Sequence, residues 1–248
     1  MQRTVIITGG SRGIGRSLTE GFSAAGYAVV VGARNSSGIE DVSRDNVRFV
    51  ATDVQNEADH KRLVETAMDW TGQVNVFINN AGFSAWRPID AIDEAFFDDM
   101  INVNLKGAFW GCKAAAGAMP AGGAIINISS LAGKRGTSNN SMYVASKFGM
   151  NGLTQSLAKE LGPAGIRVNA LCPVLIRTPG LMDALTTEWS PAKGDAEGFL
   201  AGFTAGQTAL GRLPTGEEVA SMALFLASEG ASAITGQCIN VDCGVLPQ

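Results

Sequence analysis

The sequence is poor in histidine and in clustered positive charge. His60 is its only histidine, so neither a histidine-rich metal site nor a Ser-His-Asp hydrolase is expected. We expect His60 itself, which falls in a polar helical stretch, to be a solvated surface residue. The net charge is −4 and no run of lysine or arginine occurs, so nucleic-acid or anionic-membrane binding has no electrostatic support.

Long apolar runs are also missing. No stretch of about twenty apolar residues occurs, so we expect no membrane span. The N-terminus lacks the basic region, apolar core and cleavage site of a signal peptide. The four cysteines have no paired metal-ligand spacing and lie in mostly apolar surroundings, which favours buried free thiols in a reducing cytoplasm. They are Cys112, Cys172, Cys238 and Cys243.

Short apolar runs alternate with longer helical patterns along the chain. With 248 residues, 46% hydrophobic and 17% charged, the chain can bury a substantial core. Continuously apolar strands indicate a parallel sheet covered by helices on both faces. We therefore predict an α/β fold: a single doubly wound domain over residues 1–248 with a seven-stranded parallel sheet. The expected strands are 5–7, 28–31, 47–50, 74–78, 124–128, 166–171 and 237–241, and the expected helices are about 13–26, 56–71, 94–119, 143–161 and 217–227.

Two connections depart from this alternation. The polar segment 35–45, between the second and third expected strands, is too short for a full helix with its turns. Residues 178–207 mix glycine and proline with apolar side chains and form the least regular part of the chain. A long insertion after a strand's carboxyl end is typical of a lid, so we expect a flexible substrate lid there.

A glycine-rich segment, Thr8–Gly15, joins the first expected strand to the first helix. Its spacing is G-x-x-x-G-x-G, which matches neither the common dinucleotide fingerprint nor the P-loop. Glycines allow the backbone to approach a pyrophosphate, and a helix N-terminus offers free N–H groups. Because this loop follows the first strand of an α/β pattern, it predicts nucleotide binding.

Tyr143 and Lys147 lie one helical turn apart and project from the same face. A nearby ammonium favours the phenolate, which would lower a tyrosine pKa that is ordinarily about 10. Tyr143 would then be a usable proton donor and acceptor. Taken alone, such a pair is more often an ordinary surface tyrosine and lysine.

Taken together, these segments resemble the short-chain dehydrogenase/reductase family over nearly the full length of the chain. The resemblance implies a Rossmann-type domain that transfers a hydride between a nicotinamide and a carbonyl or alcohol carbon, and hence an oxidoreductase. It rests on Thr8–Gly15, Asp53-Val54, Asn79–Gly82, Asn104, Ser130 with Tyr143 and Lys147, and the segments 210–214 and 236–242.

The resemblance implies four catalytic residues. Tyr143 would be the general acid in reduction and the base in oxidation, and Lys147 would lower its pKa and bind the nicotinamide ribose. Ser130 would polarise and orient the substrate oxygen. Asn104 would hold a water that links Lys147 to solvent, or serve only in helix hydrogen bonding, or both.

The same resemblance implies a set of cofactor-binding residues. Asp53 would meet the adenine amino group, Asn80 would lie near the adenosine ribose, and Thr178 would reach the nicotinamide carboxamide. Asn79 would brace the sheet. The full set is Gly9, Ser11, Arg12, Gly13, Ile14, Gly15, Ala33, Arg34, Asp53, Val54, Asn80, Ala81, Gly82, Tyr143, Lys147, Pro173, Ile176 and Thr178.

The second expected strand ends without the carboxylate that usually binds both ribose hydroxyls of NAD. Ala33 stands there, Arg34 follows, and Arg12 lies in the glycine-rich loop. Two guanidiniums without a competing carboxylate suit a 2′-phosphate. We therefore predict NADP(H), with NAD(H) as second choice if both arginines are solvated loop residues.

The expected substrate pocket combines aromatic and amide side chains with the lid. The family usually shows Pro-Gly after the sixth strand, whereas here Val174 follows Pro173, which would narrow the pocket. The expected substrate is a small to medium polar hydroxy or keto compound, such as a sugar alcohol, with a 3-oxoacyl thioester or an apolar ketone as alternatives. Arg87 and Arg177 either bind an anionic substrate or are exposed. The predicted substrate residues are Ser84, Trp86, Ser130, Asn140 and Val174, with Phe83 and Asn139 beside them.

Other functions remain open on the same fold. One is an isomerase, epimerase or dehydratase, and another is an NAD(P)-binding regulator without turnover. An intact set of Ser130, Tyr143 and Lys147 argues against the regulator, because a sensor needs only the cofactor site. Family members are commonly homotetramers, so we expect a homotetramer here.

Overall fold

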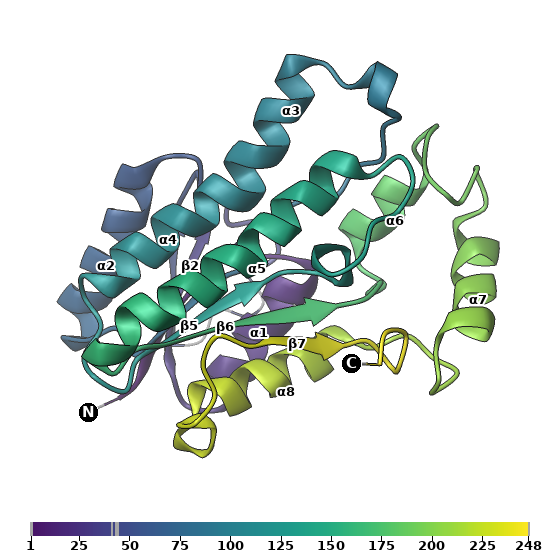
Figure 1. The fold of residues 1–248 in the computed structure, drawn as a ribbon. Coiled ribbons are helices and arrows are strands. Elements are labelled where there is room, and N and C mark those ends of the chain that lie inside the picture. Colours follow the sequence, from purple (N-terminus) through teal and green to yellow (C-terminus); the bar gives the residue numbers. More distant parts are fainter. Residues whose placement is uncertain (1, 41, 43–44, 248) are drawn as a thin grey trace.

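A single parallel sheet of seven strands forms the centre of the computed structural model, which describes residues 2–40, 42 and 45–247 (Figure 1). The strand order is β3-β2-β1-β4-β5-β6-β7, which confirms the predicted doubly wound sheet. The order reverses between β1 and β4, and ligands of such sheets bind outside the strands' carboxyl ends at that point. The strands are β1 (Thr4–Thr8), β2 (Ala28–Ala33), β3 (Val47–Ala51), β4 (Val76–Asn79), β5 (Ala124–Ile128), β6 (Arg167–Pro173) and β7 (Cys238–Val241).

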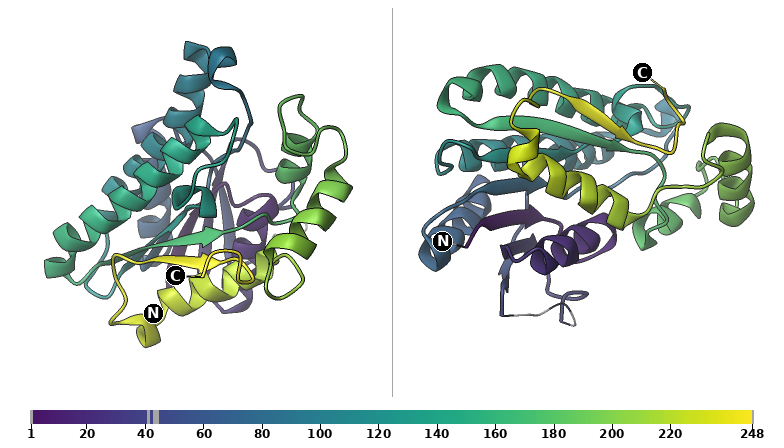
Figure 2. Two further views of the ribbon diagram at one scale, coloured as in Figure 1. Left: turned by 45° about the vertical axis from the view of Figure 1, so that its right-hand side comes forward. Right: turned by 90° about the horizontal axis from the view of Figure 1, so that it is seen from below.

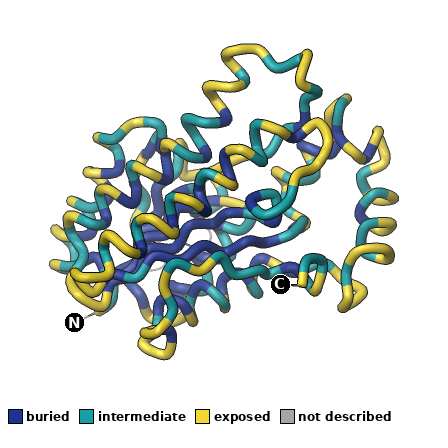
Figure 3. Tube along the Cα trace, viewed as in Figure 1, coloured by how far each residue is buried: buried dark blue, intermediate teal, exposed yellow. Residues whose placement is uncertain are grey.

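The central strands are buried along their whole length. Every residue of β1, β4 and β5 is buried, and Figure 3 shows these strands as the dark interior of the molecule. In register, Ile6 of β1 pairs with Val30 of β2 and Phe77 of β4. Strands that are covered on both faces need apolar side chains at successive positions, which explains their continuous apolar sequence.

Helices cover both faces of the sheet (Figure 2). On one face α1 (Gly13–Ala24) packs against α8 (Gly216–Ala227), and their apolar side chains join those of the strands in one core cluster. On the other face lie α2 (Glu57–Thr71), α4 (Gly107–Ala116) and α5 (Ser141–Leu161), above a second cluster. The sheet is therefore buried from both sides, as its sequence pattern requires.

The expected continuous helix 94–119 is wrong in detail. It consists of α3 (Glu94–Ile101), a π-helical turn (Asn102–Lys106) and α4, which ends at Ala116. The extra residue of a π turn is not visible in a 3.6-residue pattern, and such turns are common at functional sites. Here the turn contains Asn104, which is fully buried.

The segment 178–207 is more regular than the sequence suggested. It contains α6 (Pro179–Leu185), capped by Thr178, and α7 (Ala196–Gln207), capped by Asp195. Their apolar side chains form a third cluster that includes Trp86. Pro179 and Gly180 therefore begin α6, Pro191 and Gly194 lie in the turns before α7, and the remaining glycines lie within α7 itself.

The connection between β2 and β3 contains no helix in the described residues 34–40, 42 and 45. This agrees with the expected short crossover, of which residues 41, 43 and 44 lie outside the described chain. None of the described helices has the length and hydropathy to cross a membrane. Within the same residues, no three histidine, cysteine or acidic side chains gather as a metal site would require.

Two predictions about exposure are wrong. His60 is 0% exposed, on the face of α2 that meets the sheet, because a histidine ring can pack as an aromatic residue when it is neutral. All four cysteines are free, but only Cys112 and Cys172 are buried, while Cys238 and Cys243 are partly exposed. Cys238 lies on β7, the edge strand of the sheet, where one side lacks a neighbouring strand.

Candidate active site

The glycine-rich loop folds back closely on its own backbone. A Cβ atom at Gly15 would lie 2.0 Å from the Gly9 carbonyl oxygen, and Gly9 itself has φ +64°. Neither position accepts a side chain without displacement of the loop. The helix α1 begins at Gly13 after Arg12, whose side chain makes no capping hydrogen bond. The N–H groups of the first turn can therefore bind an anion.

The segment after β4 ties this loop to the rest of the sheet. Asn80 Nδ2 donates hydrogen bonds to the carbonyl oxygens of Thr8 and Gly9, both at 3.0 Å. Asn79 Nδ2 donates to Asn127 Oδ1 on β5 at 2.9 Å. A Cβ atom at Gly9 would lie 2.9 Å from the Cα of Ala81. The ends of β1 and β4 are thus held close together at the point where the strand order reverses.

Ser130, Tyr143 and Lys147 meet at the carboxyl end of β5. Ser130 follows that strand directly, and Tyr143 and Lys147 are on the first turns of α5. Lys147 is 4% exposed, and its Nζ donates to the Ile128 carbonyl oxygen at 2.8 Å. The same Nζ lies 5.7 Å from the centre of the Tyr143 ring. The ammonium of the predicted acid–base pair is therefore buried, and the Tyr143 side chain beside it is half-buried, so the two are not an ordinary surface pair.

The ionisation of this pair differs from the expectation. Burial raises the pKa of Tyr143, and a hydrogen bond with the Ser130 side chain lowers it by less. Against the prediction, the pKa of Tyr143 is therefore raised rather than lowered, and the Lys147 ammonium donates to the Ile128 carbonyl instead. Burial also lowers the pKa of Lys147 to about 8. Near neutral pH the phenol stays protonated, which suits a proton donor.

Asn104 shapes the loop beside Lys147. Its Nδ2 donates to the Phe83 carbonyl oxygen at 2.9 Å, and its Oδ1 accepts from the Phe83 N–H at 3.0 Å. A Cβ atom at Gly82 would lie 3.0 Å from Asn104 Oδ1 and 3.7 Å from Lys147 Nζ. The π-helical turn thus brings an amide and an ammonium to the same small space, which only glycine leaves open.

The residues predicted to meet the adenosine lie at the end of β2 and at the corner after β3. Ala33, at the end of β2, is half-buried, whereas Arg34 and Arg12 are exposed. Asp53 is held through its N–H, which donates to Asp59 Oδ2 at 2.7 Å. Its Oδ1 accepts from the Gln55 N–H at 3.0 Å. Guanidiniums and a carboxylate are therefore available at this end.

The loop after β6 closes over the glycine-rich loop. Pro173 and Ile176 are buried, and Thr178 Oγ1 accepts from the Leu181 N–H at 3.2 Å. A Cβ atom at Gly13 would lie 3.2 Å from Thr178. Val174 is half-buried and its N–H donates to the Val241 carbonyl oxygen. This loop therefore links the anion-binding turn of α1 to β6 and β7.

The predicted substrate residues differ in their environments. Trp86 is 7% exposed and belongs to the third apolar cluster, with side chains of α6 and α7, so it packs against these helices rather than forming an open wall. Asn140 is buried, and its Oδ1 has no partner among the described residues. Ser84 is half-buried, and Phe83 and Asn139 are exposed.

The two arginines named as possible anion ligands are engaged elsewhere. The Arg87 guanidinium lies 4.4 Å from the centre of the Phe96 ring and 3.5 Å from Asp93 Oδ2. Arg177 is exposed and forms a two-pronged ion pair with Glu197 on α7. Both guanidiniums thus have protein partners: Arg87 is half-buried beside Phe96 and Asp93, whereas Arg177 is exposed and ion-paired with Glu197.

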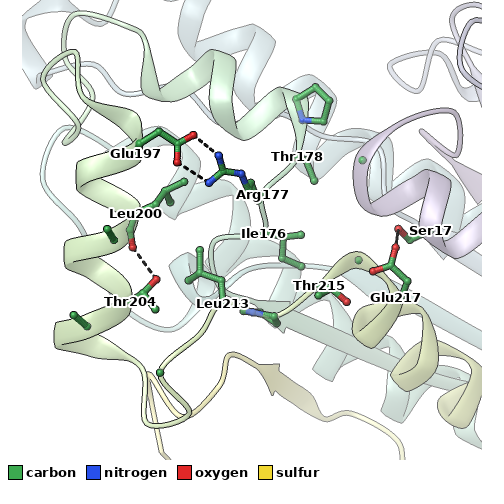
Figure 4. A pocket seen from close by; sticks show the side chains of 17 residues that line it. Ser17, Ile176, Arg177, Thr178, Glu197, Leu200, Thr204, Leu213, Thr215 and Glu217 are labelled. Carbon is green, nitrogen blue, oxygen red and sulfur yellow. Dashed lines mark hydrogen bonds and ion pairs between the residues drawn. The ribbon is translucent and has the colours of Figure 1, made fainter.

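A cavity of about 750 Å³ adjoins the glycine-rich loop at Gly13 (Figure 4). It extends from Gly13, Ile176 and Thr178 to Leu200 of α7 and Thr215 at the start of α8, and the Arg177–Glu197 pair lies on its wall. Ser130, Tyr143 and Lys147 do not line it. The cavity therefore belongs to the space between the lid and α8, beside the anion-binding turn rather than at the acid–base pair.

Sequence reasoning missed three contacts of this region. His60 and Asp59 hold the Asp53-Val54 corner, and Glu197 binds Arg177. The helix that begins after Asn56 opens with polar residues, so its sequence did not indicate that His60 points toward the sheet. Nothing in the sequence pairs Glu197 with a residue twenty positions earlier, because that contact depends on how α7 returns to the loop.

The comparisons with known proteins agree with this geometry. A family model described as enoyl-(acyl carrier protein) reductase matches residues 9–246. The chain is 34% identical to the 4-formylbenzenesulfonate dehydrogenase of Comamonas testosteroni, over 98% of this chain and 97% of that protein. It is 32% identical to the L-2,3-butanediol dehydrogenase of Corynebacterium glutamicum, over 99% of both chains.

A solved structure extends this similarity to three dimensions. The actinorhodin polyketide ketoreductase F189W variant with NADPH superposes with a TM-score of 0.88 at 29% identity, over 98% of this chain and 97% of that one. Family model, relatives and fold lead to one conclusion: the chain belongs to the short-chain dehydrogenase/reductase family. It is an oxidoreductase of that family, with a Rossmann-type parallel sheet.

Proposed function

We propose that this protein transfers a hydride between NADP(H) and the carbonyl or secondary alcohol of a small to medium polar compound. The observation that carries the proposal is that Ser130, Tyr143 and a buried Lys147 lie together at the end of β5. The relatives named above are dehydrogenases and a ketoreductase, which supports the same reaction class. Bound NADP(H) would supply or accept the hydride.

The chain's own residues would handle the proton and the substrate oxygen. The Tyr143 phenol, protonated because burial raises its pKa, would donate its proton to the substrate oxygen in reduction. Ser130 Oγ would hydrogen-bond the same oxygen and orient it. Lys147 would hold ribose hydroxyls, and Asn104 would connect its ammonium to solvent through a water. Lys147 and Asn104 would together keep the Tyr143 phenol in position and connect it to solvent, from which it regains its proton.

The adenine end would be recognised by backbone and carboxylate. Within the described chain neither the Val54 N–H nor Asp53 Oδ2 has a hydrogen-bond partner, whereas Asp53 Oδ1 accepts from the Gln55 N–H. A free N–H donor next to a carboxylate acceptor matches the acceptor nitrogen and amino group that adenine presents. The glycines of the phosphate loop would allow the pyrophosphate to lie against the α1 N-terminus.

The choice of NADP(H) over NAD(H) rests on Arg12 and Arg34. Both guanidiniums are exposed at the end where β2 finishes in Ala33 without a carboxylate. Arginine can pair with a 2′-phosphate through two parallel hydrogen bonds. The ketoreductase that shares this fold was solved with NADPH, which supports the proposal by likeness.

The substrate would enter between the loop 83–86, the Asn140 region and the lid helices. The unpartnered Oδ1 of Asn140 offers an acceptor for a substrate hydroxyl, and this favours a polar hydroxy or keto compound. Val174 would limit its size beside the nicotinamide. A sugar alcohol and a 3-oxoacyl compound are the two classes to compare first, since relatives act on vicinal diols and on 3-oxoacyl carriers by name.

A panel of carbonyl compounds tests the proposal directly. We expect the purified protein to oxidise NADPH in the presence of at least one polar ketone or aldehyde. The loss of NADPH absorbance measures this reaction. The Tyr143→Phe variant keeps the ring and lacks the acid, so turnover should fall about 10²- to 10⁴-fold while NADPH still binds. A wild-type protein that binds NADPH and turns over nothing across a broad panel would favour a regulatory role. Product that forms without net change in NADPH would favour an isomerase or dehydratase.

We also propose a homotetramer that acts in the cytoplasm. Three phenylalanines, Phe97, Phe109 and Phe148, are exposed by 42–46% on α3, α4 and α5, and such side chains suit burial between subunits. The four free cysteines suit a reducing compartment. Light scattering of the wild type should give four chains, and the double variant Phe109→Glu with Phe148→Glu should give a smaller species. A monomeric wild type would contradict this assembly.

A further inference from the structure

His60 is a fully buried histidine with a single hydrogen bond. Its ring stacks on Phe77 of β4, with ring centroids 6.3 Å apart. Its Nε2 lies 3.0 Å from the Val54 carbonyl oxygen. A carbonyl oxygen only accepts, so Nε2 carries the proton and Nδ1 is the bare acceptor. Nδ1 is buried and has no partner among the described residues.

The corner that His60 contacts is held from several sides. The Asp53 N–H donates to Asp59 Oδ2 at 2.7 Å. A Cβ atom at Gly107 would lie 3.1 Å from the Val54 side chain and carbonyl, so the start of α4 presses closely on Val54. Among the described side chains, His60 is the one that hydrogen-bonds Val54. Two successive residues of α2 therefore hold two successive residues of the corner.

We propose that His60 is a positioning residue for the adenine end of the cofactor. The inference rests on the proposed function, since it takes the free Val54 N–H and the Asp53 carboxylate as the adenine contacts. The imidazole holds the Val54 carbonyl, which restricts rotation of the backbone from which those two groups extend. Ordering them before the cofactor arrives reduces the entropy lost on binding.

The position carries a physical cost that a purely packing residue would avoid. A buried acceptor without a partner destabilises the fold, and an apolar side chain of similar size would not leave one. Burial lowers the pKa of His60, while its bond to Val54 and the charges of Asp59 and Asp53 oppose that change. The ring therefore stays neutral near pH 7, and its one donor is always directed at the corner.

Two variants separate positioning from packing. His60→Phe keeps an aromatic ring beside Phe77 but loses the donor, whereas His60→Gln keeps a side-chain N–H that can reach the Val54 carbonyl. Calorimetry would measure Kd for NADPH and for adenosine 2′,5′-bisphosphate, which carries only the adenosine half, and thermal unfolding would measure Tm. We expect His60→Phe to weaken both ligands about three- to tenfold, the worth of one hydrogen bond, and His60→Gln to recover most of that loss.

The outcomes distinguish this inference from the function beneath it. If His60→Phe lowers Tm but binds both ligands as tightly as the wild type, His60 serves packing alone and the inference is overturned. The same conclusion follows if His60→Gln binds as weakly as His60→Phe at equal Tm. If the wild type binds neither NADPH nor NADH, the proposed function itself fails, and the inference fails with it.

Discussion

The catalytic end and the adenosine end of the proposed cofactor site differ in how the fold holds their charged groups. At the catalytic end, Lys147 is 4% exposed and bonded to a main-chain carbonyl, and Asn104 is fully buried. At the adenosine end, Arg12 and Arg34 are exposed side chains on loops. Burial fixes geometry before any ligand arrives, whereas an exposed arginine must lose side-chain freedom on binding.

This difference separates two tasks. In the proposed site the acid–base chemistry would depend on groups whose positions follow from the packing of α5, the π-helical turn and β5. The choice between NADP(H) and NAD(H) would depend on the exposed side chains of Arg12 and Arg34. We therefore expect substitutions at the catalytic end to remove activity, and substitutions at the arginine end to change preference while the fold and chemistry remain.

The largest effect is expected at Lys147. Lys147→Met keeps the length of the side chain but removes the ammonium, so kcat should fall about 10²- to 10⁴-fold. Lys159→Met, an exposed lysine on the same helix α5, is the matched control and should leave kcat unchanged. Steady-state kinetics with NADPH and an accepted carbonyl compound give both values. Wild-type activity in Lys147→Met would show that the buried ammonium is not needed for turnover, and would contradict the difference proposed between the two ends.

The next effect is expected at the backbone of the glycine-rich loop, residues 8–15. Gly15→Ala places a Cβ atom where the Gly9 carbonyl oxygen lies 2.0 Å away, so the loop must shift and lose the alignment of its N–H groups. We expect NADPH affinity to fall at least about tenfold, since several hydrogen bonds to a charged pyrophosphate are affected. Gly152→Ala, where a Cβ atom meets nothing within 4 Å, is the control. Equal Kd values for the two variants would contradict close cofactor approach here.

A smaller effect is expected at the arginine end. Arg34→Ala should reduce kcat/KM with NADPH about five- to thirtyfold, as for loss of a charged hydrogen-bonding pair, and leave kcat/KM with NADH nearly unchanged. NADH is thus an internal control, because it lacks the 2′-phosphate. Equal use of NADPH and NADH by the wild type would refute the predicted preference and leave the catalytic end unaffected.

The smallest effect is on stability in mild acid. Burial depresses the pKa of His60 below its ordinary value of 6.5 in the folded protein. The stability it contributes is therefore fully present above that value and is lost as the pH falls toward the depressed pKa. Between about pH 7.5 and about pH 5.5, Tm should fall more for the wild type than for His60→Gln, which has no titrating ring. Parallel decreases would show that His60 is not the acid-sensitive group.

Much of the fold followed from short-range pattern. The strands could be placed within two residues, because β1, β4 and β5 are buried throughout and the partly buried strands β3 and β7 still carry mostly apolar side chains. The π-helical turn at Asn104 could not be predicted, since one extra residue within a helix leaves the apolar spacing almost unchanged. The inward position of His60 was also missed, because a single polar residue on an amphipathic helix carries no signal of what it contacts.

By itself the sequence determined the parallel sheet, the glycine-rich turn and the family, because periodicity and motif spacing are local properties of the chain. The tertiary structure alone decided the environment of each charged group. It turned the Lys147 ammonium toward Ile128, raised the pKa of Tyr143 by burial, and paired Arg177 with Glu197. Desolvation and long-range contacts depend on which elements pack together, and no single stretch of sequence contains that information.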